Sequence, residues 1–437
     1  MLSFGQYVFV LLVGGAGVWA AQAGWLSGAM TVSVLVIVGS AIFSLTVALR
    51  VAAAATIFRT PEPLEVRWTA PLPIYTVLCP LRREAQSLPS LVAALRRLDY
   101  PADRLDVRLV LEADDQETAR ALETIALPRE FTVVRVPAAA PRTKPKALNY
   151  ALCEARGEFV AIYDAEDVPD RSQLRAALDA FAAGGKGLGA VQAPLLIDNG
   201  GASWISSQFA AEYAIQFLGI VPLLTHFGLA PPLGGTSNHF RREALEEAGG
   251  WDPYNVTEDA DLGYRLARFG WRIGDIAPPT WEEAPENLVA WLRQRARWIK
   301  GHLQTWLVLM RNPRRTLREM GLAPFLAMQL VLGGGLLAAV AHGPLFVLLA
   351  AIPFTGVTPP HVVALTLVIF GYATAALAAL FAAVRLREPR IGLAALTMPL
   401  YWPLSTIAAA WAVFQLVVRP HHWSKTEHGR ARRKTPT

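Results

Sequence analysis

Three carboxylates directly follow a short apolar run in the middle of the chain. Phe159–Tyr163 is strand-like and leads straight into Asp164, Glu166 and Asp167. Carboxylates so close together repel one another unless a cation joins them. A hard divalent ion such as Mg²⁺ or Mn²⁺ prefers oxygen ligands and keeps coordination positions for phosphates. The cluster therefore predicts a metal site, and the alternative is a solvated loop that caps the next helix.

A second acidic group, Thr257-Glu258-Asp259, precedes a helix-like run over Leu262–Phe269. One of its carboxylates could act as a general base that takes the proton of an attacking hydroxyl. Alternatively, Thr257 and Asp261 serve only to start the helix.

A third group combines an amide, a cation and an aromatic ring. Gln294, Arg297 and Trp298 are spaced i, i+3 and i+4, so on a helix they share one face. The arginine offers a fork for phosphate, and the tryptophan offers a flat surface for the apolar side of a sugar. An amphipathic helix at a membrane interface, with tryptophan at headgroup depth, is the alternative.

Other polar residues also follow apolar runs. One acidic set could hold a ribose or base, or simply cap a helix, and it comprises Glu112, Asp114 and Asp115. A set of two lysines and an asparagine could contact phosphate or only solvent, and it comprises Lys144, Lys146 and Asn149. The small polar segment Gly234–His239 could let backbone approach a sugar closely, or form a turn. For His239, a hydrogen-bonded core position is favoured over a ligand role.

The elements that must position these groups alternate between strand-like and helix-like runs. Four such pairs predict a parallel sheet with helices on both faces, whose ligands bind beyond the carboxyl ends of the strands. No Gly-x-Gly-x-x-Gly follows the first strand, which argues against a nicotinamide enzyme. The expected pairs are 74–79 with 87–98, 107–111 with 116–125, 131–136 with 147–155, and 159–163 with 173–181.

The composition places this sheet domain between two apolar segments. Of the 437 residues, 53% are hydrophobic and 17% charged, which is too apolar for an ordinary soluble enzyme. No charged residue precedes Arg50, and all acidic residues except Glu388 and Glu427 lie between Glu62 and Glu319. The net charge of +6 comes from Lys and Arg at membrane edges and in the tail, which favours membrane anchoring over nucleic-acid binding. The two cysteines suit a reducing compartment.

The apolar segments predict membrane spans at both ends. Residues 7–24 and 31–49 are each close to the length of a spanning helix, and the arginines that follow them place the central domain in the cytoplasm. Residues 322–354, 361–384 and 391–418 are the apolar stretches beyond Glu319. Pro399 and Pro403 interrupt the last one, which could be a broken or re-entrant hairpin.

The expected organisation is therefore an N-terminal transmembrane hairpin over 1–58 and a cytoplasmic domain over 59–287. Interfacial amphipathic helices over 288–320, transmembrane helices over 321–418 and a basic cytoplasmic tail over 419–437 complete it.

Together these motifs resemble the processive, inverting glycosyltransferases of family 2, such as cellulose synthase catalytic subunits, hyaluronan synthases and bacterial glucan synthases. The resemblance covers roughly residues 75–300 by motif, and the whole chain by architecture. It implies a GT-A-type, Rossmann-like α/β domain flanked by transmembrane helices that conduct a polymer outward.

The resemblance also assigns roles to the residues. It implies that Asp115, with Asp114, contacts the nucleotide, and that Asp164 and Glu166 hold Mg²⁺ or Mn²⁺, with Asp167 the alternative second ligand. In the matching Thr257-Glu258-Asp259 motif the aspartate is the catalytic base. Gln294, Arg297 and Trp298 would hold the pyrophosphate and the acceptor sugar. Trp423, Lys425 and Thr426 resemble a gating loop that closes over the donor site.

The resulting expectation is a multi-pass enzyme of the cell's inner (plasma) membrane. It would transfer sugar from a UDP-sugar, with UDP-glucose favoured, to the end of a growing β-linked polysaccharide. The expected partners include the lipid bilayer and secretion subunits, but no nucleic acid. The alternative enzyme adds a single sugar to a lipid acceptor. A transporter or a sugar-sensing pseudoenzyme is disfavoured, because ionisable residues sit mainly at span edges, with His342 the exception, and because Asp164, Asp259 and Arg297 are all present.

Overall fold

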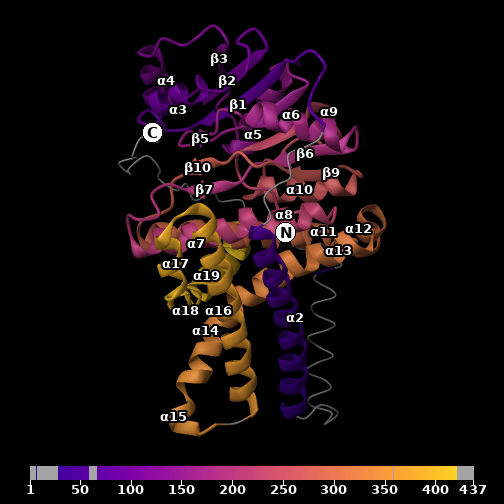
Figure 1. Ribbon diagram of the computed structural model, residues 1–437, viewed down its shortest axis with the longest axis vertical. Coiled ribbons are helices and arrows are strands. Elements are labelled where there is room, and N and C mark those ends of the chain that lie inside the picture. The colour runs from indigo at the N-terminus through magenta and orange to yellow at the C-terminus, as the bar shows by residue number, and fades with distance from the viewer. Residues whose placement is uncertain (1–5, 7–27, 59–65, 358, 421–437) are drawn as a thin grey trace.

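The computed structural model describes residue 6 and residues 28–58, 66–357 and 359–420. A sheet-containing domain forms one end of the molecule, and long helices project from it (Figure 1). The strands are β1 (Tyr75–Leu81), β2 (Leu105–Glu112), β3 (Phe131–Val136), β4 (Phe159–Ile162), β5 (Val168–Pro169), β6 (Leu188–Gln192), β7 (Leu195–Ile197), β8 (Asn238–Arg241), β9 (Arg272–Asp275) and β10 (Thr280–Glu282).

Twenty α-helical and π-helical segments are also present among the described residues, beginning with the long α2 (Gly28–Ile57). Those of the sheet domain are α3 (Leu88–Leu95), α4 (Gln116–Glu123), α5 (Lys144–Glu154), α6 (Gln173–Gly184), α7 (Trp204–Ile215), the π-helical turn η1 (Gln216–Ile220), α8 (Val221–His226), α9 (Arg242–Glu247) and α10 (Glu258–Arg268). Those that follow are α11 (Leu288–Leu309), α12 (Pro313–Met320), α13 (Leu322–Met328), the π-helical turn η2 (Gln329–Gly334), α14 (Gly335–Ala350), α15 (Ile352–Thr355), α16 (Pro359–Leu386), α17 (Pro389–Ala395), α18 (Met398–Tyr401) and α19 (Leu404–Val418).

The main sheet has seven strands in the order β3-β2-β1-β4-β8-β6-β9. It is mixed, which corrects the parallel sheet expected from the sequence. β8 runs antiparallel to both β4 and β6, with His239 opposite Ala161. The chain enters β8 from the Gly234–Ser237 segment, which lies at the carboxyl end of β4, so it must run back along its neighbour. A second, three-stranded sheet has the order β5-β10-β7.

The alternation of side chains along the strands builds two cores. Val77 on β1 points into a core with Leu91 of α3 and Leu174 of α6. Its neighbour Leu78 points to the opposite face, against a core that includes Leu148 of α5. Successive strand residues face opposite sides, so helices cover both faces as the sequence predicted, and the carboxyl edge between them is left for a site.

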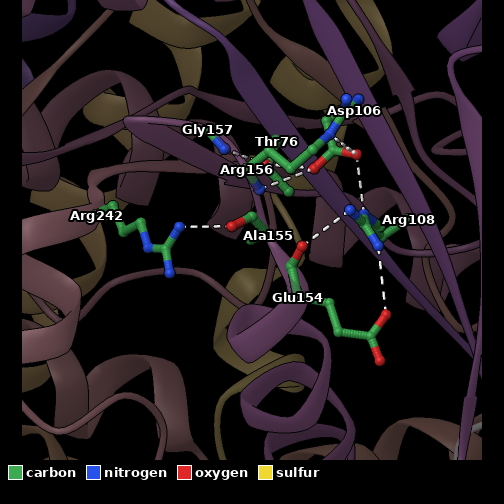
Figure 2. Close-up of polar contacts among 8 residues, drawn as sticks. All are labelled: Thr76, Asp106, Arg108, Glu154, Ala155, Arg156, Gly157 and Arg242. Atoms are coloured by element: carbon green, nitrogen blue, oxygen red, sulfur yellow. Dashed lines mark hydrogen bonds and ion pairs between the residues drawn. The ribbon is translucent and has the colours of Figure 1, made fainter.

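The amino ends of the central strands are tied together by a buried aspartate (Figure 2). Asp106 of β2 accepts hydrogen bonds from Thr76 Oγ1 of β1 and Arg108 Nε, both at 2.9 Å, and from Arg156 N at 3.1 Å. Gly157 donates to Thr76 Oγ1, and a Cβ at Gly157 would lie only 2.4 Å from Thr76 N. This network fixes the sheet at the edge opposite the carboxyl ends.

Four helical stretches among the described residues are long and apolar enough to cross a membrane. They are Ser40–Ile57, Leu322–Ala350, His361–Leu386 and Met398–Val418. Figure 1 shows α2, α14 and α16 extending away from the sheet domain together. The expected first span, residues 7–24, lies outside the described residues.

The last apolar stretch is broken, as its prolines predict. α17 ends at Ala395, the short α18 contains Pro399, and α19 begins directly after Pro403. A proline lacks the N–H that would continue a helix from the preceding turn. Whether this stretch re-enters the membrane stays a prediction, as do the domain bounds.

Candidate active site

A cavity of about 740 Å³ lies at the carboxyl edge of β1 and β4 and continues between the long helices. It brings together three motifs that are far apart in the chain. The predicted site residues that line it are Asp164, Glu166, Thr257, Glu258, Asp259, Gln294, Arg297 and Trp298. The loop after β4, the start of α10 and the middle of α11 therefore face one space.

Asp259 lies in the first turn of α10, where helical N–H groups favour negative charge. Its Oδ1 accepts a hydrogen bond from Ala260 N at 2.8 Å. Gly235 packs so closely that a Cβ there would lie 3.3 Å from Asp259 Oδ2. Burial raises the pKa of Asp259, while the Ala260 N–H, Lys144 and Arg297 oppose that shift. The carboxylate is thus a stronger base than an exposed aspartate, next to an open space.

The helix-start alternative does not account for Thr257. This residue occupies the N-cap position of α10, but its side chain makes no capping hydrogen bond. Among the described residues its buried Oγ1 has no hydrogen-bond partner. Asp261 pairs instead with Arg265, at 2.6 Å. Glu258 is buried, and this burial, with repulsion from Asp259, raises its pKa to about 8.

Lys144 is the lysine that reaches the cavity. Its Nζ lies 2.5 Å from Asp164 Oδ1 and 2.7 Å from the carbonyl oxygen of Gly235. Lys146, which the sequence also offered as a phosphate contact, lies two residues on, about 200° around α5, and does not line the cavity. Its Nζ donates to Glu112 at 3.0 Å and to two backbone carbonyls. A substrate contact by Lys146 stays a prediction.

The acidic pair after β2 supports the rim of the cavity. Asp115 caps α4 by accepting from Thr118 N at 3.2 Å, and it also accepts from Arg83 N at 2.5 Å. Asp114 pairs with Arg142 at 2.5 Å. Arg83 and Arg142 line the cavity, whereas the two aspartates do not. The capping alternative therefore describes Asp115 in this structure, and the nucleotide contact of both aspartates stays a prediction.

The carboxylates after β4 suit a divalent cation chemically. Asp164, Glu166 and Glu282 line the cavity, and burial with repulsion from the neighbouring carboxylates raises the pKa of Glu282 well above its ordinary value. Asp167 is different, because its Oδ2 accepts from Asp164 N at 2.6 Å and from Thr236 Oγ1, which turns it into the loop. Among the described residues no three His, Cys, Asp or Glu side chains already form a metal-binding group. Asp164 and Glu166, with positions left for phosphate oxygens, fit Mg²⁺ or Mn²⁺.

α11 supplies the opposite wall. Trp298 packs beside the rings of Phe209 and Tyr213, with centroids 5.6 and 6.1 Å away. Gln294 is buried, and within the described part of the chain its Oε1 has no hydrogen-bond partner. Burial lowers the pKa of Arg297, and Glu258 and Asp259 oppose this. The arginine is therefore a partly buried cation beside the candidate base.

α11 and α10 are in close contact. A Cβ on Gly301 of α11 would lie 2.2 Å from Thr257 Oγ1. The glycine thus allows the helix that carries Arg297 to press against the residue that opens α10.

Sequence reasoning gave His239 its correct place. It is fully buried, with Nδ1 2.8 Å from Tyr75 Oη and Nε2 3.2 Å from Gln173 Oε1. The sequence did not predict the roles of Glu212 and Tyr213 of α7, which line the cavity. Only the position of a carboxylate in an apolar helical run could have pointed to them. The expected gating-loop residues Trp423, Lys425 and Thr426 lie outside the described residues.

Comparisons with known proteins agree with this geometry. A sequence profile described as "Glycosyltransferase like family 2" matches residues 71–301, the segment that carries the sheet and all three motifs. The chain belongs to glycosyltransferase family 2. It is thus a glycosyltransferase enzyme with a GT-A-type domain.

The names of individual relatives specify different products. The beta-monoglucosyldiacylglycerol synthase of Synechocystis sp. is 30% identical over 67% of this chain and 62% of that protein. Cellulose synthase 1 catalytic subunit of Komagataeibacter xylinus is 26% identical over 57% of this chain and 34% of that protein. The chain thus matches less than two thirds of the length of these relatives.

A solved structure supports the fold. The mannosyltransferase PcManGT from Pyrobaculum calidifontis, in complex with GDP-Man and Mn²⁺, has a TM-score of 0.59 and 22% identity, over 88% of this chain and 98% of that one.

Proposed function

We propose that this chain is a membrane-anchored, inverting glycosyltransferase that takes sugar from a UDP-sugar and transfers it to a hydroxyl of a membrane lipid. The observation that carries the proposal is the continuity of one cavity. Its lining includes Asp259 and Arg297 at the sheet domain, and Leu332, Ala339 and Ala375 on the helices apolar enough to span a membrane. An apolar acceptor can enter between such helices while its hydroxyl reaches the base.

The reaction is one displacement at the anomeric carbon. The acceptor oxygen bonds to that carbon, the bond from carbon to the diphosphate oxygen breaks, UDP leaves, and Asp259 receives the hydroxyl proton. General-base assistance of this kind contributes roughly 10²–10⁴-fold. Attack from the face opposite the leaving group inverts the configuration, so an α-linked donor gives a β-linkage.

Negative charge accumulates on the leaving diphosphate. Arg297, partly buried near Asp259, offers a positive charge toward that group. Fixed charges in a water-poor site are effective because they need no reorganisation. Lys144 supplies a second positive charge beside Asp164. A divalent ion held by Asp164 and Glu166 would add electrostatic stabilisation of the diphosphate. Trp298 would cover the apolar face of a sugar.

The acceptor class separates two forms of this proposal. The lipid form is favoured by the apolar membrane section of the cavity and by the synthase from Synechocystis, whose name specifies a glucosylated diacylglycerol. The processive form, extension of a β-linked polysaccharide with export, was favoured by the sequence. It is supported by Trp298 and Tyr213, which line the cavity and whose rings could stack on a sugar chain, and by the cellulose synthase relatives. UDP-glucose is the favoured donor in both forms.

The location follows from the same reasoning. We place the protein in the plasma membrane as a multi-pass protein with its catalytic domain in the cytoplasm, where UDP-sugars are made. Secretion subunits would be partners only in the processive form.

Product analysis tests the proposal. Purified protein in lipid nanodiscs is given radiolabelled UDP-glucose with Mg²⁺ or Mn²⁺, and products are separated by chromatography and by size. A single labelled glycolipid is expected, and Asp259→Asn should remove it. A labelled ladder or polymer would establish the processive form, and label found only as free sugar would refute both.

A further inference from the structure

The membrane section of the cavity contains one arginine that the proposed chemistry does not use. Arg50 lies in α2, within the candidate span Ser40–Ile57, and lines the cavity. Its guanidinium stacks over the ring of Trp402, 4.4 Å from the centroid. Its buried Nη1 has no hydrogen-bond partner among the residues that the structure describes. A buried cationic donor without an acceptor is costly, and such groups in membrane segments mark ligand sites.

The surroundings of Arg50 do not balance its charge. Glu212 of α7 is the carboxylate within electrostatic range, but it is already held by Arg295 and by the hydroxyl of Tyr401. Two guanidinium groups therefore share one carboxylate at this end of the cavity. His342, whose Nδ1 lies 3.3 Å from Tyr372 Oη, adds a polar edge and no anion. An anion is the missing complement.

From this geometry we infer that Arg50 and Trp402 form a binding site for the phosphate of a phospholipid acceptor. The inference rests on the lipid form of the proposed function and specifies its substrate class. A guanidinium binds phosphate through two N–H groups, and its face can remain stacked on an aromatic ring. Arg50 lies in the last two turns of α2, at the end nearest the sheet domain (Figure 1).

The cavity lining offers a complement for each part of such a lipid. Apolar residues such as Leu336 and Ala339, the guanidinium of Arg50 and the carboxylate of Asp259 all line this one cavity. A phospholipid with a hydroxylated headgroup carries acyl chains, a phosphate and a free hydroxyl. Binding the phosphate at Arg50 would direct the hydroxyl toward the base. A neutral lipid or a neutral sugar chain would leave the guanidinium without its complement.

Binding of two lipid probes tests the site directly. Purified full-length protein in detergent is titrated with phosphatidylglycerol or with diacylglycerol, and bound lipid is counted by native mass spectrometry. We expect the unmodified protein to retain phosphatidylglycerol in preference to diacylglycerol. Arg50→Gln should weaken phosphatidylglycerol binding by about tenfold or more, since hydrogen bonds to charged groups contribute about 1.5–3 kcal/mol.

The matched control is Arg385→Gln. Arg385 lies in the last turn of α16, donates to the carbonyl of Ile57 and does not line the cavity. The variant therefore removes an arginine at the same membrane edge without changing the cavity. This variant should bind both lipids as the unmodified protein does. Equal retention of the two lipids by the unmodified protein, or unchanged phosphatidylglycerol binding by Arg50→Gln, would overturn the inference.

Transfer assays separate this inference from the proposed function. In nanodiscs, Arg50→Gln should lose the preference for phosphatidylglycerol over diacylglycerol as acceptor, whereas Arg385→Gln should keep it. If no lipid is glycosylated but a polymer forms, the proposed lipid reaction fails. Selective phospholipid binding at Arg50 would then still be read from the mass spectra.

Discussion

Lys144 Nζ lies 2.5 Å from Asp164 Oδ1, so a buried ammonium joins the start of α5 to the loop after β4. Burial alone would lower the pKa of Lys144, but the carboxylates of Asp164, Glu258 and Asp259 raise it above its ordinary value. The Lys144 ammonium is therefore charged at neutral pH. It holds together the side of the cavity where a diphosphate would bind.

Replacing Lys144 tests that role. Lys144→Met should lower kcat/KM for UDP-glucose by about 10–100-fold, the effect of losing one charge-assisted contact of about 1.5–3 kcal/mol. Steady-state kinetics of donor hydrolysis measures it. Lys186→Met removes an exposed lysine that does not line the cavity and should leave the kinetics unchanged. A Lys144→Met enzyme with normal kinetics would show that the ammonium only supports the fold.

The two aspartates of α10 should separate catalysis from stability. Asp259→Asn removes the base and should reduce kcat by about 10²–10⁴-fold, with little change in melting temperature. Asp261→Asn weakens the buried pair with Arg265 and should lower the melting temperature while kcat is largely kept. Rates and thermal unfolding in detergent measure both. Similar rate losses in the two variants would contradict the assignment of Asp259 as the catalytic base.

Metal titration should distinguish the two acidic neighbours. Glu166 lines the cavity, whereas Asp167 holds the loop through Thr236 Oγ1 and Asp164 N. Chelation with EDTA should abolish transfer, and Mn²⁺ should restore it. Glu166→Gln should raise the Mn²⁺ concentration for half-maximal activity by about tenfold, the lower end of the effect expected for a buried charge contact. Asp167→Asn should instead lower the melting temperature. If Asp167→Asn raised the Mn²⁺ requirement and Glu166→Gln lowered the melting temperature, Asp167 would be the metal ligand and Glu166 the loop contact.

Stability should fall with rising pH because of Glu258. Its folded pKa of about 8 lies above the value near 4.5 of the exposed group. Between these values the folded protein holds a proton that the unfolded chain has lost, so raising the pH favours unfolding. From pH 6 to 8 the loss should be about 2 kcal/mol. Glu258→Gln should flatten this dependence in thermal unfolding at several pH values; an unchanged slope would assign it to another group.

The contact between α10 and α11 should tolerate no added methyl group. Gly301→Ala would place a Cβ 2.2 Å from Thr257 Oγ1, which should cost about 1–3 kcal/mol of stability and lower kcat by displacing Asp259. Gly392→Ala in α17, where the added Cβ meets atoms at 3.5 Å, should be neutral or slightly stabilising. Activity and unfolding measured side by side check this, and a Gly301→Ala protein equal to the unmodified one would contradict the packing.

Much of the fold could be predicted from the order of the elements. Each predicted strand is present within two residues at either end, because apolar β-branched runs followed by polar residues are strong local signals. The direction of β8 could not be predicted. The direction of β8 depends on the end of β4 at which the chain arrives after α8. That arrival point is set by packing between distant segments.

The candidate site was predictable where a motif has its own chemistry. Asp164, Asp259 and Arg297 do line one cavity. The choice between Lys144 and Lys146 was not predictable, because it depends on the rotation of α5 against the sheet. Arg50 was read from the sequence only as a membrane-edge charge, since nothing local shows that Trp402, far along the chain, lies beneath its guanidinium.

α11 belongs to both halves of the molecule. It carries Arg297 and Trp298, and it packs along α19, where Lys300 Nζ lies 3.2 Å from Gln415 Oε1. A helix that matches a bilayer poorly tilts to adapt, and a tilt of α19 would pass to α11 and shift the side chains that meet the donor. Acyl-chain length of the host membrane should therefore set the turnover rate, making the enzyme responsive to the thickness of the bilayer in which it works.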